Sequence, residues 1–332
     1  MFRRLIFELE KRGHTVLVTA REKINAVELY REEGLEPYVV GKYSTTLVGK
    51  LVESSRRIRA MAKLVTDKLG TLDAVISNTG VEATRVGFGL GAKVHTFHDH
   101  PEAVHQLLLA LPLSNYVYAP WVIYAGIYKK YVPSSTRIVF YHGFLHVAWM
   151  PYVQVDEHVI GKCGLDPSRP VVVFRESETG AAYLFGKQDI TVDAVKVLAE
   201  EMPFVQFVAR PRYNYENLTK AFRGYVNVTI FRKPVDMQSL LAKASLLIGG
   251  GATMSLEASY WGTPVVQCRP VSSPIATWLE QQQLAVPAKT LDEAVEKGKI
   301  LFGKRNVEHA RKVHDCLEFP LEKLIQYVET EE

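Results

Sequence analysis

The sequence predicts an α/β protein built from two doubly wound halves. Helical and strand patterns alternate almost throughout the 332 residues, and short apolar runs follow amphipathic segments in both halves. Such alternation is typical of parallel sheets with helices on both faces, and the length is sufficient for two domains of common size. We expect the carboxyl ends of the strands in both halves to face a cleft, where ligands of this fold class bind.

The first half, residues 1–155, begins with a helical pattern. Phe2, Leu5, Ile6 and Leu9 recur at helical spacing, the pattern stops before residue 14, and a buried strand is expected at 15–20. The same order of helix and strand is expected three more times, at 27–34 and 38–41, at 45–70 and 73–77, and at 81–91 and 93–97.

The second half, residues 156–332, repeats this alternation. The apolar periodicity lapses between Pro151 and Pro170, and we place the domain boundary there. Strands are then expected at 171–174, 205–209, 227–230, 245–249 and 264–268, and helices at 193–202, 237–244 and 254–261.

The composition narrows the function classes. The net charge is +4 and no block of like charges occurs, so nucleic-acid binding is not expected. Cys163, Cys268 and Cys316 form neither an even set nor a CxxC pair, which disfavours a disulfide framework or a zinc site and favours a cytoplasmic protein. No run reaches about 18 apolar residues, so we expect neither a membrane span nor a signal peptide.

A glycine-rich turn between a strand and a helix indicates an anion site. The strand at 245–249 is followed by Gly250 and Gly251, and a helix begins directly afterwards, so backbone N–H groups at its N-terminus are expected to face the cleft. Thr253 offers a hydroxyl either as the N-cap or as a phosphate donor, and Glu257 is placed to accept hydrogen bonds from two vicinal ribose hydroxyls. The stretch predicts a nucleotide site, and a common turn with a solvated Glu257 is the alternative.

This stretch resembles the donor-site motif of two-Rossmann glycosyltransferases of the GT-B type. The MurG-like order of Gly-Ala, a helix with Glu, and Gly-x-Pro is present from Gly250 to Pro264. The stretch is also similar to the non-hydrolysing UDP-N-acetylglucosamine 2-epimerases, for which the match extends upstream to residue 234 and downstream to Arg269. The whole chain resembles an uncharacterised, largely archaeal family of GT-B-like proteins of unknown function.

The resemblance implies contacts with a nucleoside-diphosphate sugar, with UDP as the favoured nucleotide. The backbone of Gly250, Gly251 and Ala252 would contact the diphosphate, and Glu257 would contact the ribose. The expected reaction is glycosyl transfer to an acceptor that the sequence does not identify. An epimerase-like enzyme and a non-catalytic nucleotide-sugar sensor or scaffold are the alternatives. No cofactor is expected, and the oligomeric state stays open.

Three arginines follow strands of the second half. Arg175 follows the first strand, and Arg210 and Arg212 follow the strand at 205–209, in a region that resembles the Pro-x-His-x-Asn segment of the epimerases. Each guanidinium can neutralise diphosphate charge, and a surface ion pair is the alternative for each.

The first half offers candidate acid–base groups. They directly follow the strand at 93–97 and are His98, Asp99, His100 and Glu102. Their position resembles that of the His-Glu-Gln-Asn or His-x-Glu-Ala segments of GT-B enzymes, where deprotonation of an acceptor hydroxyl requires a group titrating near neutrality. One alternative is a metal site that includes His105, although the spacing fits no specific metal motif and we expect no metal. The other is a polar loop in which Asp99 caps the next helix.

Two departures from the epimerases disfavour epimerisation by paired carboxylates. In the turn of Asn78, Thr79 and Gly80, which is a candidate acceptor contact, Thr79 stands where the epimerases carry an aspartate. Leu256 stands where they carry the first glutamate of a Glu-Glu pair. Glycosyl transfer needs one base and a stabilised leaving diphosphate, so these departures affect it less.

Two other segments allow both a functional and a structural interpretation. His142 and Gly143 are a third candidate near the expected hinge, or a strand followed by a turn. The apolar segment 107–132 ends near Lys129 and Lys130, which suits a peripheral membrane contact, but prolines interrupt it and we expect it to pack in the core.

The first domain lacks an expected N-terminal strand. GT-B first domains resemble one another in beginning with a strand and a loop before the helix that here starts near Met1. Because that strand is central in a doubly wound sheet, its omission would leave the strands at 15–20 and 73–77 without their common neighbour. We expect that the natural protein starts upstream, with about 15–25 further residues, on the usual strand and loop lengths.

Overall fold

The structure is a computed structural model that describes residues 2–22, 27, 30–31, 34–44, 46–177, 189–211 and 215–330. The chain forms two compact units: Met1–Ala148 with Glu318–Glu332, and Trp149–Leu317. The sequence pattern instead places the boundary at residue 155 and assigns the last residues to the second half. The difference arises because helical periodicity predicts that a helix forms but not which sheet it covers.

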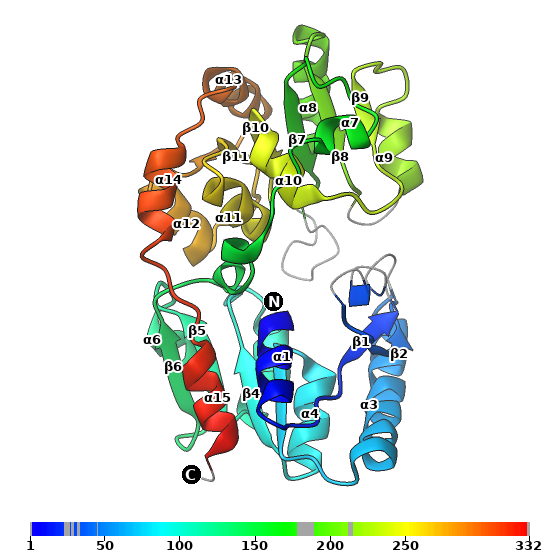
Figure 1. The fold of residues 1–332 in the computed structure, drawn as a ribbon, viewed down its shortest axis with the longest axis vertical. Coiled ribbons are helices and arrows are strands. Elements are labelled where there is room, and N and C mark those ends of the chain that lie inside the picture. The colour runs from blue at the N-terminus through cyan, green and yellow to red at the C-terminus, as the bar shows by residue number, and fades with distance from the viewer. Residues whose placement is uncertain are drawn as a thin grey trace. The chain divides into compact units, whose positions relative to one another are not determined.

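The first unit contains two separate parallel sheets among the described residues (Figure 1). A two-stranded sheet pairs β1 (Thr19–Glu22) with β2 (Tyr38–Lys42). A four-stranded sheet has the order β3 (Ala74–Asn78), β4 (Lys93–Phe97), β5 (Tyr116–Pro120) and β6 (Arg137–Tyr141). β1 and β3 are thus edge strands that do not pair with each other in the described part of the chain.

The helices of the first unit have clear local signals. Thr46 accepts a hydrogen bond from the N–H of Gly49 at the start of α3, and this helix ends at Gly70, whose φ is 73°. Most of the helix predicted at 27–34 lies outside the described residues. The helices are α1 (Arg3–Lys11), α3 (Leu47–Leu69), α4 (Val81–Gly89), α5 (Val104–Ala110), α6 (Ala125–Lys129) and α15 (Leu321–Glu329), with the 3-10 helices η1 (Leu111–Leu113) and η2 (Leu145–Ala148).

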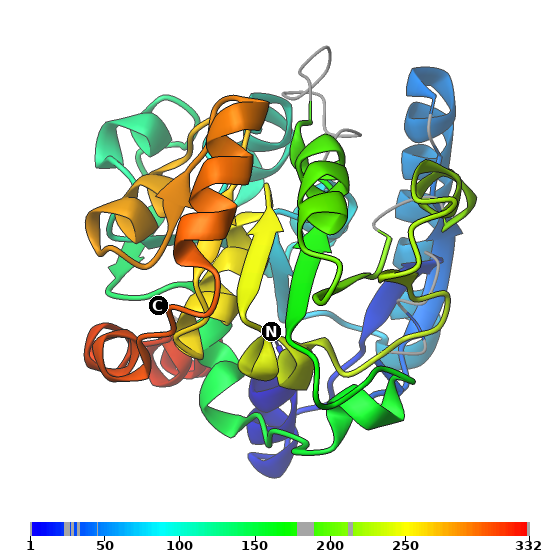
Figure 2. The same ribbon diagram turned by 90° about the horizontal axis from the view of Figure 1, so that it is seen from above.

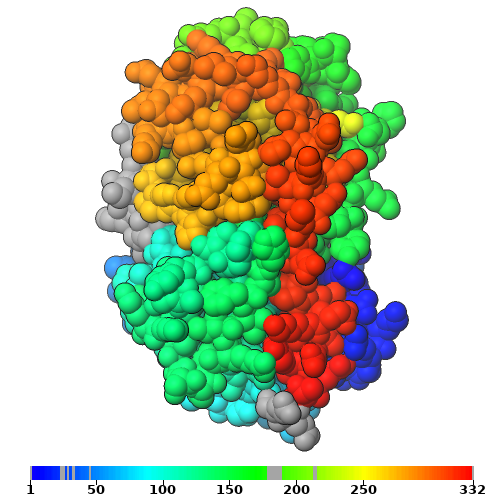
Figure 3. Space-filling model, turned by 90° about the vertical axis from the view of Figure 1, so that its left-hand side faces the viewer, coloured from blue at the N-terminus to red at the C-terminus, as the bar shows by residue number. Residues whose placement is uncertain are grey.

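The first and last helices of the chain lie side by side. The Arg12 guanidinium is 3.1 Å from Glu322 and 3.4 Å from Glu329 of α15. Figure 3 shows the red atoms of α15 beside the blue atoms of α1. Buried Leu324 and Ile325 give α15 an apolar face, so the C-terminal residues complete the first unit.

The apolar segment 107–132 contributes a core cluster of the first unit. Its fully buried members include Leu107, Leu111, Ile123 and Tyr128, so the expectation of core packing is confirmed for these residues. Within the described ranges, no helix has both the length and the apolar character that crossing a membrane requires.

The second unit contains one continuous parallel sheet of six strands. Figure 2 shows β10 in yellow beside β7 in green at its centre. The strands, in the spatial order β12-β11-β10-β7-β8-β9, are β12 (Val286–Pro287), β11 (Val265–Gln267), β10 (Leu246–Gly249), β7 (Val171–Arg175), β8 (Gln206–Ala209) and β9 (Val228–Ile230).

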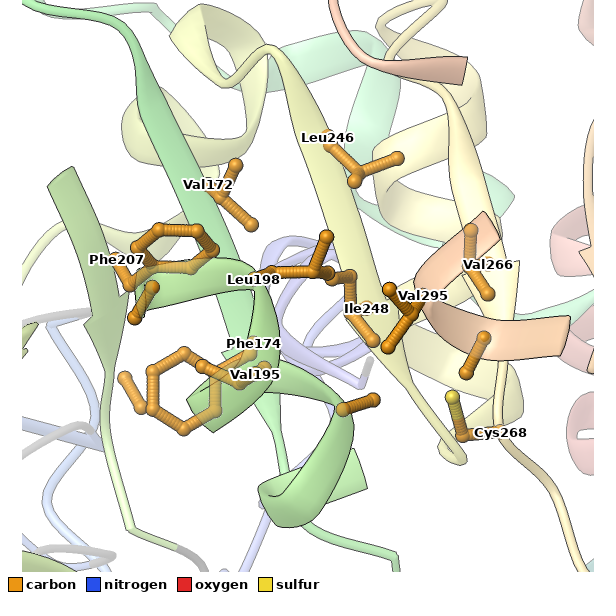
Figure 4. Packing of buried hydrophobic residues seen from close by; sticks show 14 of the residues in the cluster. Val172, Phe174, Val195, Leu198, Phe207, Leu246, Ile248, Val266, Cys268 and Val295 are labelled. Atoms are coloured by element: carbon orange, nitrogen blue, oxygen red, sulfur yellow. The ribbon is translucent and has the colours of Figure 1, made fainter. Parts of the chain in front are cut away.

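The core of the second unit fills the space between this sheet and its helices (Figure 4). Phe174 of β7, Phe207 of β8 and Ile248 of β10 are completely buried, and they pack with Val195 and Leu198 of α8 (Thr191–Glu201). Alternate residues of buried strands face this cluster, which fixes the strand register. The same register brings the ends of β7, β10 and β11 together at one edge.

The remaining helices of the second unit join or cover these strands. They are α7 (Val159–Lys162), α9 (Tyr215–Ala221), α10 (Met237–Lys243), α11 (Ala252–Tyr260), α12 (Pro274–Gln281), α13 (Leu291–Leu301) and α14 (Val307–His314), with the 3-10 helix η3 (Met150–Tyr152).

Candidate functional site

The glycine-rich turn lies at the carboxyl edge of the second sheet. Gly249 pairs with Arg175 on one side and with Gln267 on the other. A Cβ atom on Gly249 would lie 2.7 Å from the carbonyl oxygen of Arg175, and one on Gly250 would lie 2.1 Å from Ser177 Oγ. Glycine is therefore required here because neighbouring protein atoms approach the backbone closely.

The turn leaves the N-terminus of α11 without a side-chain cap. Gly251 is the N-cap and contributes no side-chain hydrogen bond. The expectation that Thr253 could be the N-cap is wrong, because the helix already begins at Ala252 and Thr253 lies exposed in its first turn. Uncapped N–H groups at a helix N-terminus favour an anion, and the Thr253 hydroxyl is still available as a second donor.

Glu257 is held by specific partners rather than merely solvated. Its Oε1 accepts a hydrogen bond of 3.2 Å from the indole N–H of Trp149, and the side chain of Gln238 also hydrogen-bonds to the carboxylate. Burial raises the pKa of Glu257 to about 7, against the lowering effects of Gln238, Trp149 and the positive charge of Arg175. The carboxylate is thus poised to change its charge near neutral pH.

The sequence patterns did not identify Trp149 and Gln238. Trp149 is the first residue of the second unit, just before the stretch in which the periodicity lapses. Gln238 lies on α10, which the pattern predicts as an ordinary helix. No local signal identifies either residue, because both contacts with Glu257 join segments that are distant in the sequence.

The structure places the three predicted arginines differently. Arg175 ends β7, directly beside Gly249, and its charge acts on Glu257. Arg210 follows β8 and is partly buried. Arg212 lies outside the described residues. Arg269, which follows β11, reaches back to the turn, where its guanidinium is 3.5 Å from the carbonyl oxygen of Gly250.

His98 of the first unit is a buried histidine. Only 1% of its surface is exposed, and its Nδ1 is 3.0 Å from the hydroxyl of Tyr128. Burial lowers the pKa of His98 to about 4. Its Nε2 has no hydrogen-bond partner among the described residues. The ring is therefore neutral at pH 7 and does not face solvent.

The other three candidates form a cluster beside His98. His100 Nε2 is 3.5 Å from Asp99 Oδ1, and His100 Nδ1 is 3.7 Å from Glu102 Oε1. The His100 side chain is 36% exposed, whereas both carboxylates are mostly buried. Asp99 does not cap α5, whose N-cap is Ala103 without a side-chain hydrogen bond. An imidazole between two carboxylates can accept and hold a proton.

Neighbouring loops of the first unit carry two special backbone positions. Thr79 has a φ of 48°, which is strained for a β-branched residue, and its N–H and hydroxyl both donate to the carbonyl oxygen of Phe97. At Gly143 a Cβ atom would lie 2.0 Å from the carbonyl oxygen of Glu318. A glycine is thus required at position 143, because the backbone of Glu318 packs directly against it. The ring of His142 lies against Trp121, with 4.2 Å between centroids.

The predicted residues thus form two groups, one at the carboxyl edge of each main sheet. Arg175 and the turn around Gly250 lie together near Glu257 in the second unit, and His98 to Glu102 lie together in the first. In the described part of the chain, no set of three or more His, Cys, Asp or Glu side chains is arranged to hold a metal ion.

The architecture is of the GT-B type, with two Rossmann-like domains. The chain superposes on a Staphylococcus aureus MnaA–UDP structure with a TM-score of 0.73 and 13% identity, over 99% of this chain and 92% of that one. It superposes on a Methanocaldococcus jannaschii UDP-GlcNAc 2-epimerase, in complex with UDP-GlcNAc and UDP, with a TM-score of 0.69 and 11% identity, over 98% and 96%. The spinosyn forosaminyltransferase SpnP gives a TM-score of 0.61 and 15% identity, over 99% and 95%. The expected GT-B type of fold is confirmed.

The chain belongs to the family described as "Protein of unknown function (DUF354)", whose model matches residues 1–329. One relative is the uncharacterized protein MJ0665 of Methanocaldococcus jannaschii, which is 27% identical over 274 residues, covering 81% of this chain and 78% of that protein. The expected membership of an uncharacterised family is therefore confirmed.

Proposed function

We propose that this protein is a glycosyltransferase that takes a sugar from a nucleoside diphosphate, of the UDP type, and transfers it to an acceptor hydroxyl. The observation that carries the proposal is Glu257, a partly buried carboxylate held beside the uncapped N-terminus of α11 and under the charge of Arg175. A carboxylate next to an anion site suits a ribose next to a diphosphate.

In this proposal the second unit binds the donor and stabilises the leaving group. Backbone N–H groups at Gly250, Gly251 and Ala252 contact the diphosphate, Arg175 and Arg210 balance its charge, and Glu257 accepts from the ribose hydroxyls. When the bond between the sugar C1 and the diphosphate oxygen breaks, the negative charge develops where these donors already point. This arrangement requires no cofactor.

The first unit would supply the base. His100 is the exposed imidazole of its cluster, and Asp99 and Glu102 stabilise the imidazolium that forms when it takes the acceptor's proton. His98 is buried and neutral, so we assign it to holding this loop against Tyr128. The acceptor oxygen then attacks the sugar C1 as the diphosphate leaves.

Calorimetric titration tests the donor site. We expect UDP or UDP-N-acetylglucosamine to bind with micromolar affinity and Glu257→Gln to weaken binding by about 10- to 100-fold, from the loss of a charged hydrogen-bond acceptor. Glu308→Gln, on the exposed face of α14, is the matched control. If UDP, GDP, CDP and TDP all fail to bind below millimolar concentration, the proposal is wrong.

Turnover tests the reaction. His100→Gln should abolish release of UDP in the presence of acceptor while leaving the affinity for the UDP-sugar unchanged, and the exposed His105→Gln should be fully active. Binding without turnover with any acceptor would indicate a non-catalytic sensor.

Epimerisation is the second candidate, because the TM-score for the Methanocaldococcus jannaschii UDP-GlcNAc 2-epimerase exceeds that for the forosaminyltransferase SpnP. Thr79 and Leu256 stand against it, since a carboxylate pair is incomplete at these positions. Inversion at C2 of UDP-N-acetylglucosamine, followed by NMR without acceptor, would decide for the epimerase.

A further inference from the structure

Gln238 presents an unused acceptor beside Glu257. An ionised carboxylate only accepts hydrogen bonds, so the Gln238 atom that faces it must be the amide nitrogen Nε2. The other end of the amide, Oε1, is buried and has no hydrogen-bond partner among the described residues. A buried acceptor without a donor costs about 1–3 kcal/mol, so this oxygen is a position where a ligand O–H or N–H is favoured.

The backbone that carries Gln238 is fixed. Asp236 caps α10 by accepting from the N–H of Ser239 at 3.0 Å, and Ser239 Oγ in turn accepts from the N–H of Asp156 at 2.8 Å. Ser239 is fully buried. The first turn of α10 is therefore anchored on both sides, and the amide of Gln238 is presented from a rigid element.

Trp149 fixes the other side of the carboxylate. Its indole N–H can only donate, and it donates to Oε1 of Glu257 at 3.2 Å. Met150, the next residue, is buried, which anchors the chain beside the indole. Glu257 therefore has a defined orientation before any ligand binds.

We propose that Gln238 contacts the ligand, with its Oε1 accepting a hydrogen from one ribose hydroxyl while Trp149 positions Glu257, so that the site selects ribonucleoside over deoxyribonucleoside diphosphates. This inference rests on the proposed function, in which Glu257 binds the ribose. Two vicinal hydroxyls match the two oxygen acceptors on Glu257 and Gln238, whereas a deoxyribose leaves one of these buried acceptors unpaired. A site built to hydrogen-bond a hydroxyl rejects the analogue that lacks it.

The test compares UDP with 2′-deoxy-UDP and 3′-deoxy-UDP by calorimetry. The wild type should bind UDP about 5- to 100-fold more tightly than at least one deoxy analogue, on the cost of an unpaired buried acceptor. In Gln238→Met, which keeps the side-chain length without polar atoms, UDP should bind more weakly. The preference for UDP over the analogue that lacks the hydroxyl bound by Gln238 should fall to within about 3-fold. Gln281→Met, at an exposed position of α12, should keep the wild-type ratio.

The comparison of ratios separates ligand contact from a structural role. A merely structural defect in Gln238→Met weakens all three nucleotides equally and leaves both ratios unchanged, which would overturn the inference. If that variant does not fold, Gln238→Asn gives the same readout, because its shorter amide withdraws the oxygen from the ribose. If the wild type binds none of UDP, GDP, CDP and TDP, the proposed function is overturned together with this inference, whereas unchanged ratios overturn the inference alone.

Trp149→Phe tests the positioning role. It removes the N–H donor but keeps an aromatic ring, so the ionised form of Glu257 loses one of the hydrogen bonds that lower its pKa. UDP binding should then require a higher pH than in the wild type, with near-normal affinity at pH 9. An equal loss of affinity at every pH from 6 to 9 would show that Trp149 does not act through the carboxylate.

Discussion

The two units of this protein differ in how their strands are joined into sheets. In the second unit, β7 and β10 pair residue by residue and lie inside a six-stranded sheet, so their apolar side chains are almost completely buried. In the first unit, β1 and β3 are edge strands among the described residues, and Ala74, Val75 and Ile76 of β3 stay partly exposed. The same alternation of helices and strands thus gives one continuous sheet in the second unit and two separate sheets in the first.

This difference shows that the helices of the first unit bury their apolar faces even where the strands do not form one continuous sheet. α1 buries Leu5 and Leu9 although no strand of the described residues joins β1 to β3. The expectation that these two strands are left without a common neighbour is confirmed for the described residues. Edge strands carry unpaired backbone groups and expose apolar side chains, so we expect stability and hydrogen exchange to differ between the two units.

The largest effect on stability is expected when one isoleucine in each main sheet is replaced by alanine. Ile248→Ala in β10 removes a completely buried side chain and should lower the free energy of unfolding of the second unit by about 3–5 kcal/mol. Ile76→Ala in β3 removes a partly exposed one and should cost the first unit about half as much or less. Urea unfolding with unit-resolved hydrogen exchange measures both. Equal costs would contradict the contrast.

The next prediction compares the stability of the wild type with that of a variant without the Glu257 carboxylate, at two pH values. Burial raises the pKa of Glu257 from 4.5 to about 7. The folded second unit thus keeps its proton at pH values where the unfolded chain has lost it, and its stability falls as the pH rises from 4.5 to 7. Glu257→Gln avoids this loss, so it should raise the free energy of unfolding on the order of 1–3 kcal/mol at pH 8 and much less at pH 4.5.

Urea denaturation at both pH values measures this effect. A destabilised Glu257→Gln protein at pH 8 would mean that hydrogen bonds from Trp149 and Gln238 outweigh the burial of the charge. The predicted gain in stability accompanies a loss of UDP affinity, as expected for a residue kept for binding rather than for folding.

The sequence predicted the parts of the site that lie within one strand and its following helix. The Gly250 turn, Glu257 on α11 and Arg175 at the end of β7 were predicted because a strand-to-helix turn always brings such residues to one edge. Their grouping at that edge agrees with the prediction, while their role in binding stays a prediction.

Contacts between distant segments could not be predicted. Trp149 and Gln238 meet Glu257 through tertiary packing, and α15 joins the first unit through pairs such as Arg12 with Glu322. The burial of His98 was also missed, since a histidine after a strand has the same local pattern whether it faces solvent or Tyr128.

The gap between the two sheets of the first unit suggests a test by an added strand. An extended segment of about six apolar residues with a short glycine loop, fused ahead of Phe2, should pair with the free edges of β1 and β3 and slow their amide exchange by about tenfold, or about 1.4 kcal/mol. The same segment with prolines at alternate positions cannot donate to a ladder and is the control. If both fusions exchange alike, the edges of β1 and β3 do not accept a strand.

The smallest effect is expected in the paired part of the first sheet, at the hydrogen bond between Tyr128 and His98. Tyr128→Phe removes a hydroxyl that is 3.0 Å from Nδ1 inside the core, so this buried nitrogen loses that hydrogen bond. We expect a loss of about 0.5–1.5 kcal/mol in the free energy of unfolding. Tyr225→Phe, which removes a solvent-exposed hydrogen bond of 2.6 Å to Glu200 in the second unit, is the matched control and should cost less than about 0.5 kcal/mol. Because β4 and β5 are paired on both sides, the buried pair should remain protected even though β3 is exposed. Urea denaturation measures the two costs, and a Tyr128→Phe cost no larger than that of Tyr225→Phe would contradict a stabilising role for the buried hydrogen bond between Tyr128 and His98.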